Sequence, residues 1–100
     1  MIRNDPGVTR HVASPPGGFR GPTKRSVTIA GHPTSISLEP MFWTALETAA
    51  MGYGLPLNAL IAQIDALRIS ADDPANLASA IRTWLFAQIL SVSESQSQQG

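Results

Sequence analysis

Few side chains in this sequence have the types and spacing that catalysis or metal binding requires. The chain contains no cysteine, and its two histidines, His11 and His32, do not stand at the spacing of a zinc site. The adjacent carboxylates Asp72 and Asp73 precede Pro74, where a helix start explains them as capping residues. No serine lies in a Gly-x-Ser-x-Gly motif, and no glycine-rich phosphate loop is present. The sequence therefore predicts a protein that is not an enzyme and that carries no metal or other cofactor.

Opposite charges are concentrated in different parts of the chain, although the net charge is zero. Residues 1–25 contain five arginines and lysines against one aspartate, which gives +4, and the remaining residues carry −4. A basic arm on a mildly acidic body indicates an anionic partner for the arm. A solvated tail with scattered charges is the alternative interpretation of the same distribution.

The length of 100 residues is typical of a single domain. We expect a disordered, basic Pro/Gly-rich tail over residues 1–23, a folded domain over residues 24–90 and a disordered Ser/Gln-rich tail over residues 91–100. No apolar run approaches the roughly 20 residues of a membrane span, and the N-terminus lacks the apolar stretch of a secretory signal. We therefore expect a cytoplasmic protein without a membrane partner.

Two short segments in which apolar and polar residues alternate indicate β-strands at residues 24–30 and 34–38. The intervening Gly31-His32-Pro33 predicts a turn, so the two strands would form a hairpin. One face of this hairpin would carry the apolar residues Val27, Ile29, Ile36 and Leu38. The opposite face would carry the hydroxyl groups of Ser26, Thr28, Ser35 and Ser37. Such short strands need further strands and covering helices, for which a second copy of the chain is the expected source.

Two helices are predicted directly after the hairpin. The first begins at Pro40, because a missing N–H costs nothing in the first turn, and ends near Met51. Gly52 then supplies the left-handed residue that terminates many helices. The second helix begins at Leu55-Pro56 and ends near Ser70.

A third predicted helix is capped by Asp73 or Asn76 and is apolar on two sides. Trp84 belongs to one apolar side, whereas Phe86 and Leu90 lie roughly opposite. We expect one side to meet its own chain and the other side to meet a second copy. The predicted fold class is mainly α, with a short N-terminal β-hairpin or ribbon.

The order of strand, helix, glycine break and helix resembles the ribbon-helix-helix family, the class of the Arc and methionine repressors. Within residues 34–64, Ser35-Ile36-Ser37-Leu38 resembles the ribbon. Residues 42–50 resemble the first helix of that family, and residues 57–61 resemble the start of the second.

A further resemblance, over residues 24–90, is to small bacterial proteins described as ribbon-helix-helix domain proteins. Residues 24–32, with the stretch Val-Thr-Ile-Ala-Gly-His, and residues 76–82 carry it. The two resemblances imply a ribbon-helix-helix fold with a third C-terminal helix, in an intertwined homodimer. The ribbon strands of two chains would pair antiparallel and enter the major groove of duplex DNA.

The resemblance also implies roles for particular residues. Outward ribbon positions, which include Pro33, would read bases, and backbone amides at the start of the second helix would hold a phosphate. The DNA-binding residues expected on this basis are Lys24, Arg25, Thr28, Ser35, Ser37, Leu57 and Asn58. The dimer-interface residues expected on this basis are Ile36, Leu38, Trp43, Leu60, Ile64, Trp84 and Phe86.

Two functions remain open at this point. The first is a small homodimeric DNA-binding protein that regulates transcription through its β-ribbon. The second is a protein-interaction or oligomerisation module, similar to an antitoxin or an adaptor, which keeps the dimer fold without reading bases. The short side chains of Ser35 and Ser37, Pro56 where the family often has a capping serine, and the acidic body favour the second function. A hairpin beside the ribbon would also widen the sheet to four strands in a dimer.

Overall fold

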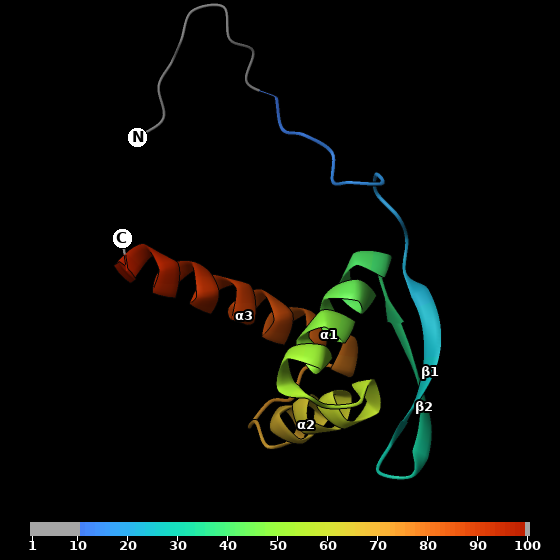
Figure 1. Ribbon diagram of the computed structural model, residues 1–100. Coiled ribbons are helices and arrows are strands. Elements are labelled where there is room, and N and C mark those ends of the chain that lie inside the picture. The colour runs from blue at the N-terminus through green and yellow to red at the C-terminus, as the bar shows by residue number, and fades with distance from the viewer. Residues whose placement is uncertain (1–10, 100) are drawn as a thin grey trace, which may run out of the picture.

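The computed structural model describes residues 11–99, and the side chains of residues 11–94. In this part of the chain a β-hairpin is followed by three helices (Figure 1). The elements are β1 (Thr23–Ile29), β2 (His32–Leu38), α1 (Pro40–Tyr53), α2 (Leu57–Ile69) and α3 (Leu77–Gln99). The expectation of an N-terminal hairpin followed by three helices is confirmed.

The hairpin turn is formed by Ala30 and Gly31, one residue earlier than the sequence indicated. Both residues have positive φ, of 50° and 81°, and such a two-residue turn follows the right-handed twist of the strands. Ile29 is therefore paired with His32, and both His32 and Pro33 belong to β2. The expected turn at Gly31-His32-Pro33 is wrong. Pro33 can belong to β2 because its nitrogen points to the free edge of the sheet, where no hydrogen bond to β1 is lost.

The helix ends follow from local sequence, with one correction. Gly54, with φ of 67°, caps α1, and the expected terminator Gly52 lies inside the helix. Pro56 precedes α2, which ends before Ser70 as expected. Of the two predicted caps for α3, Asn76 is the one used: its Oδ1 accepts a hydrogen bond of 2.8 Å from the Ser79 amide.

All three helices lie on one side of the hairpin, and its other face is not covered by any described element (Figure 1). The alternation of the strands explains this arrangement, since only one face is apolar. The core between hairpin and helices contains the buried residues Val27, Ile36, Leu38, Trp43, Leu46, Ala50, Leu60, Ile61, Ile64, Ile81 and Leu85. A single chain thus supplies both the strand pair and its cover, whereas a second copy was the expected source.

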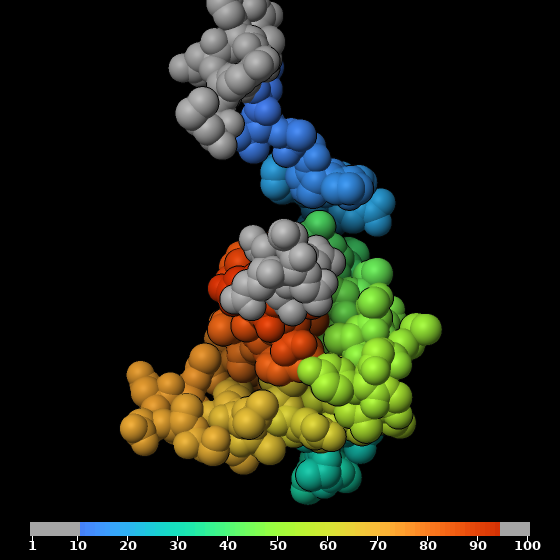
Figure 2. All heavy atoms as spheres, turned by 60° about the vertical axis from the view of Figure 1, so that its left-hand side comes forward, coloured from blue at the N-terminus to red at the C-terminus, as the bar shows by residue number. Residues whose placement is uncertain are grey.

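The two ends of the described chain leave the core in different ways. Residues 11–22 contain no helix or strand and lead away from the body, while the hairpin turn extends past the helices on the other side (Figure 2). Helix α3 continues through Gln99, although the Ser/Gln-rich composition from residue 91 indicated a disordered tail. Its second half projects beyond the core (Figure 1). Phe86 and Leu90 lie on a side of the helix that the core residues Ile81 and Leu85 do not occupy, and both are exposed.

Candidate nucleic-acid interface

The uncovered face of the hairpin carries short polar side chains. Antiparallel pairing sets Lys24 beside Ser37, Ser26 beside Ser35, and Thr28 beside Pro33, so all six side chains share this outer face. Five of them are exposed, and Ser37 is half-buried. The sequence-based assignment of Ser26, Thr28, Ser35 and Ser37 to one face agrees with this register.

Arg25 lies on the inner face of the hairpin, because neighbouring residues of a strand point to opposite sides. Its guanidinium carbon lies 4.5 Å from the ring centre of Trp43, and its Nη1 lies 3.5 Å from a Glu47 carboxylate oxygen. The indole N–H of Trp43 donates a 2.9 Å hydrogen bond to the Thr23 carbonyl. The side chain of Arg25 therefore packs at the edge of the core. The sequence predicted that Lys24 and Arg25 both bind DNA, but the register places them on opposite faces of the hairpin.

The start of α2 presents backbone amides without a side-chain cap. Pro56 precedes the helix, and its carbonyl accepts hydrogen bonds from the amides of Ala59 and Leu60, at 3.0 Å and 3.1 Å. Within the described chain, the amides of Leu57 and Asn58 have no backbone acceptor. The side chain of Asn58 is exposed, and that of Leu57 is half-buried. Unpaired amides at a helix N-terminus favour an anion such as phosphate.

The carboxylates of the described chain lie outside the two strands, and one of them, that of Glu47, is ion-paired with Arg25 on the inner face of the hairpin. Within the described chain, three carboxylates are ion-paired, Glu39 with Arg82, Glu47 with Arg25 and Asp65 with Arg68. Asp72 and Asp73 lie in the loop between α2 and α3, and Glu94 lies on α3. Neither strand carries a carboxylate, so an anionic partner meets no repulsion from the hairpin's own side chains.

The ion pair between Glu39 and Arg82 ties the start of α1 to α3. Arg82 donates a 3.0 Å hydrogen bond from Nε to a carboxylate oxygen of Glu39, and its Nη2 lies 2.9 Å from the same oxygen. A hydrogen bond from its own backbone amide, followed by the bond from Arg82, holds the pKa of Glu39 below its ordinary value. Arg82 also lies 5.6 Å from the ring centre of Phe42. Because the two residues are separated by 43 positions, no local pattern in the sequence indicates the pair.

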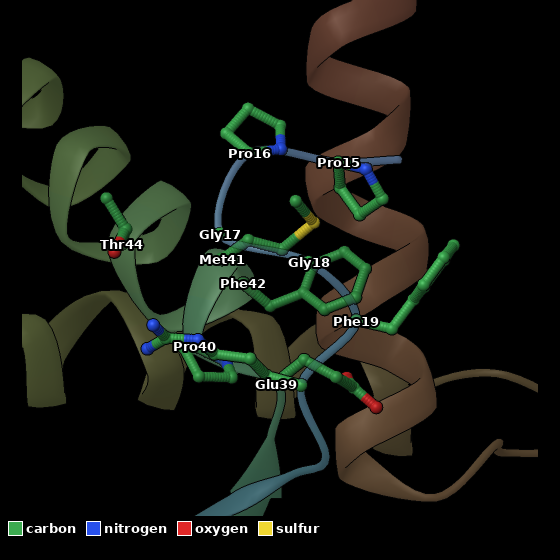
Figure 3. A pocket seen from close by; sticks show the side chains of 11 residues that line it. Pro15, Pro16, Gly17, Gly18, Phe19, Glu39, Pro40, Met41, Phe42 and Thr44 are labelled. Carbon is green, nitrogen blue, oxygen red and sulfur yellow. The ribbon is translucent and has the colours of Figure 1, made fainter. Parts of the chain in front are cut away.

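An open hollow of about 560 Å³ lies where residues 15–20 pass the start of α1. Phe19, Met41 and Phe42 point around it, and Glu39 lies at its rim, with α3 running beside it (Figure 3). The lining is mainly apolar and brings no nucleophile next to a base. Within the described residues no group of three or more histidine, aspartate or glutamate side chains could hold a metal ion. No helix among these residues is long and apolar enough to cross a membrane.

The residues expected at a dimer interface fall into two groups. Five of them are buried within one chain: Ile36, Leu38, Trp43, Leu60 and Ile64. Trp84 is half-buried, with its ring centre 6.0 Å from that of Tyr53, and Phe86 is 59% exposed. Contact of these seven residues with a second copy stays a prediction. Of the seven, only Trp84 and Phe86 have side chains that are accessible at the surface of a single chain.

The free edge of β2 is a candidate assembly site, and β2 is the strand that the resemblance led us to expect to pair with a second copy. Ile29 and His32 close the hairpin, and hydrogen-bonded pairs alternate with non-bonded pairs from there. The backbone groups of Ser35 and Ser37 therefore point away from β1, towards the free edge. The turn residues Ala30 and Gly31 fix this register. The sequence prediction placed the turn later, because Pro33 is also typical of turns.

Comparisons with known proteins identify the domain. Searches of curated proteins and of solved structures find no match to the chain. The model of one family, described as a ribbon-helix-helix domain, matches residues 22–89, which include both strands, α1, α2 and most of α3. Proteins of this family are typically dimeric regulators that bind DNA, and the family is generally non-catalytic. With 68 of its 100 residues matched, the chain belongs to the ribbon-helix-helix domain family.

Proposed function

We propose that this protein is a small homodimeric DNA-binding protein that regulates transcription and meets duplex DNA with the outer face of its hairpin. One observation carries the proposal: that face is polar, uncovered by any described element, and free of carboxylates. Lys24 supplies a positive charge there, and hydroxyl groups supply donors and acceptors. A surface of this composition fits a partner rich in phosphate oxygens.

The proposed dimer forms through the free edges of β2 from two chains. If Ile36 lies opposite Ile36 of the second copy, Ser35 and Ser37 exchange backbone hydrogen bonds with Ser37 and Ser35 across the two-fold axis. Pro33, which has no N–H to donate, then falls at the end of the paired segment. The result is one four-stranded antiparallel sheet, with the β1 strands outside and the β2 strands inside.

This sheet assigns different parts of DNA to the inner and outer strands. Four strands at about 4.8 Å spacing place the outer strands about 14 Å apart, compared with a major groove about 12 Å wide. Lys24 and Thr28 on the β1 strands would therefore lie over the phosphate backbones. Ser35 and Ser37 on the β2 strands would face the groove. The free amides of Leu57 and Asn58 would bind a further phosphate.

The proposal is tested by replacing the two inner hydroxyls, Ser35→Ala with Ser37→Ala. Specific binding to a selected duplex should weaken by roughly 1–3 kcal/mol for each base interaction that the variant removes, while non-specific binding persists. The free energy of unfolding should stay within about 0.5 kcal/mol of the parent. A control with Thr44→Ala and Thr48→Ala removes two exposed hydroxyls from α1 and should leave both quantities unchanged.

Fluorescence anisotropy of labelled duplexes, measured over a series of salt concentrations, gives both binding constants. Loss of specific binding in the serine variant alone supports base contact by β2. If the parent protein binds no duplex even at low salt, the proposal of DNA binding is wrong.

A protein-interaction module, similar to an antitoxin or adaptor, is the second candidate. The observation that favours it is the short reach of the outer face, because serine and threonine discriminate bases less well than arginine, asparagine or glutamine. Under this alternative the double serine variant would change assembly or stability, and there would be no duplex affinity to weaken. Pull-down from the source cell with the parent and the serine variant would then identify a partner that depends on this face.

A further inference from the structure

One ridge of side chains on α3 is apolar in the middle and oppositely charged at its ends. Arg82, Phe86, Leu90 and Glu94 follow one another at intervals of four residues, so they form a continuous ridge along the helix. Phe86 is 59% exposed and Leu90 is 48% exposed. The core residues Ile81 and Leu85 lie on a different side of the same helix. The apolar middle of the ridge is therefore left uncovered by its own chain, as are Ile89 and Val92 elsewhere on the helix.

The surface beside this ridge is hollowed and apolar. An open groove of about 500 Å³ is lined by Phe42, Arg82, Thr83, Phe86, Ala87 and Leu90. Phe42 also lines the hollow beside residues 15–20, so this ring is common to the two hollows. A ridge next to a groove is the surface that one helix needs to receive the ridge of another.

We propose that this ridge packs antiparallel against the same ridge of a second copy of the chain. Two copies related by a two-fold axis near the level of residue 88 would place Phe86 of one chain beside Leu90 of the other. The same operation brings Arg82 of each chain next to Glu94 of its partner. Parallel packing would instead bring Arg82 against Arg82 and Glu94 against Glu94, which is unfavourable. The opposite charges at the two ends of the ridge therefore favour a second copy of the same helix as the partner, and they favour the antiparallel orientation.

The geometry of helix packing permits this contact. Ridges formed by residues four apart interdigitate when two helices cross at about 50°, the commonest arrangement in globular proteins. Arg82 already binds Glu39 through Nε and Nη2. Because a guanidinium has five N–H donors, Arg82 keeps donors for Glu94 of the second copy. A two-fold axis repeats both the apolar and the charged interactions, so each of them occurs twice.

This contact does not use the backbone edge of β2 and does not require DNA. It is therefore a second self-complementary surface in addition to the proposed sheet, and failure of DNA binding would leave it standing. The effect of substitutions on α3 on association, measured without DNA, separates this contact from the pairing of the β2 strands and from DNA binding.

The first test is Phe86→Glu, which places a charge in the centre of the ridge. Sedimentation over a range of concentrations should show self-association weakened roughly tenfold or more, because centrally buried aromatic residues dominate such interfaces. Leu67→Glu on α2 is the matched control, since Leu67 is 63% exposed and lies outside the ridge and groove. Circular dichroism establishes that both variants are folded. A parent protein that stays monomeric, or equal weakening in both variants, would overturn the proposal.

The second test fixes the direction of the helices by cysteine cross-linking. The native chain has no cysteine, so every disulfide comes from the introduced residues. Phe86→Cys and Leu90→Cys chains of different tag length are mixed and oxidised. Antiparallel packing should yield mainly the mixed disulfide, and each variant alone should cross-link much less. If Phe86→Cys alone cross-links as readily as the mixture, the antiparallel arrangement is refuted.

Discussion

Lys24 and Arg25 are neighbours in the chain, yet they should respond in opposite ways to the same substitution. Lys24 lies on the outer face of the hairpin, and Arg25 lies on the inner face against Trp43 and Glu47. We predict that Lys24→Gln changes DNA binding and leaves stability unaffected. Arg25→Gln should lower stability and leave the salt dependence of DNA binding unaffected.

The size of each effect follows from the interactions that the substitution removes. A partly exposed cation over an indole contributes about 0.5–1 kcal/mol, and an ion pair with side chains 40% and 52% exposed contributes about 0–1 kcal/mol. Arg25→Gln should therefore lower the free energy of unfolding by about 0.5–1.5 kcal/mol. Lys24 is exposed, so its substitution should stay within about 0.5 kcal/mol. In the proposed dimer, removal of two phosphate interactions should reduce the slope of log K against log salt by about 1.8.

Urea unfolding gives the stability of each variant, and duplex binding at several salt concentrations gives the slope. The two variants remove the same formal charge, so any difference between them reports position and not net charge. If Arg25→Gln reduced the slope as much as Lys24→Gln while stability stayed constant, the assignment of the outer face would be wrong.

Three further predictions concern the fold. Ala30→Asn should raise the free energy of unfolding by about 0.5–1 kcal/mol in thermal or urea unfolding, because asparagine tolerates the positive φ that strains alanine; a decrease would refute this. Leu46→Ala should lower the same quantity by about 2–5 kcal/mol, since Leu46 has no exposed surface, and a decrease of less than about 1 kcal/mol would contradict it. The lowered pKa of Glu39 stabilises the fold above pH 4.5, and this contribution disappears as the pH falls towards the folded pKa. Glu39→Gln should thus be less stable than the parent at pH 7 and approach it in acid, and a constant difference would refute the linkage.

Local patterns predicted the elements and their faces. Alternation over a few residues assigned Val27 and Ile36 to the inner face of the hairpin, and the register agrees. Errors arose where two residues competed for one role. Pro33 resembles a turn residue because proline favours turns, although Ala30 and Gly31 form the turn. Gly52 resembles a helix terminator, but α1 continues through Gly52 to Tyr53 and is capped by the next glycine, Gly54.

Interactions between distant segments were beyond the sequence. Nothing near Arg25 indicates that its guanidinium lies over the ring of Trp43, since that arrangement depends on how α1 crosses the strands. The same holds for Glu39 and Arg82, which are brought together by the packing of α3. The outer face of the hairpin was easier to predict, because facing outward in a strand requires only the alternation of side chains. The same alternation places Arg25, which was grouped with Lys24 as a DNA-binding residue, on the inner face.

The placement of Trp43 gives the protein an internal optical reporter. This indole is 3% exposed and is hydrogen-bonded to the first residue of β1, whereas Trp84 is half-buried beside Tyr53. Detachment of the hairpin from α1 would bring water to Trp43 and shift its fluorescence emission to longer wavelengths. A Trp84→Phe variant would isolate this signal. Movements of the hairpin that accompany partner binding could then be followed in real time without any attached dye.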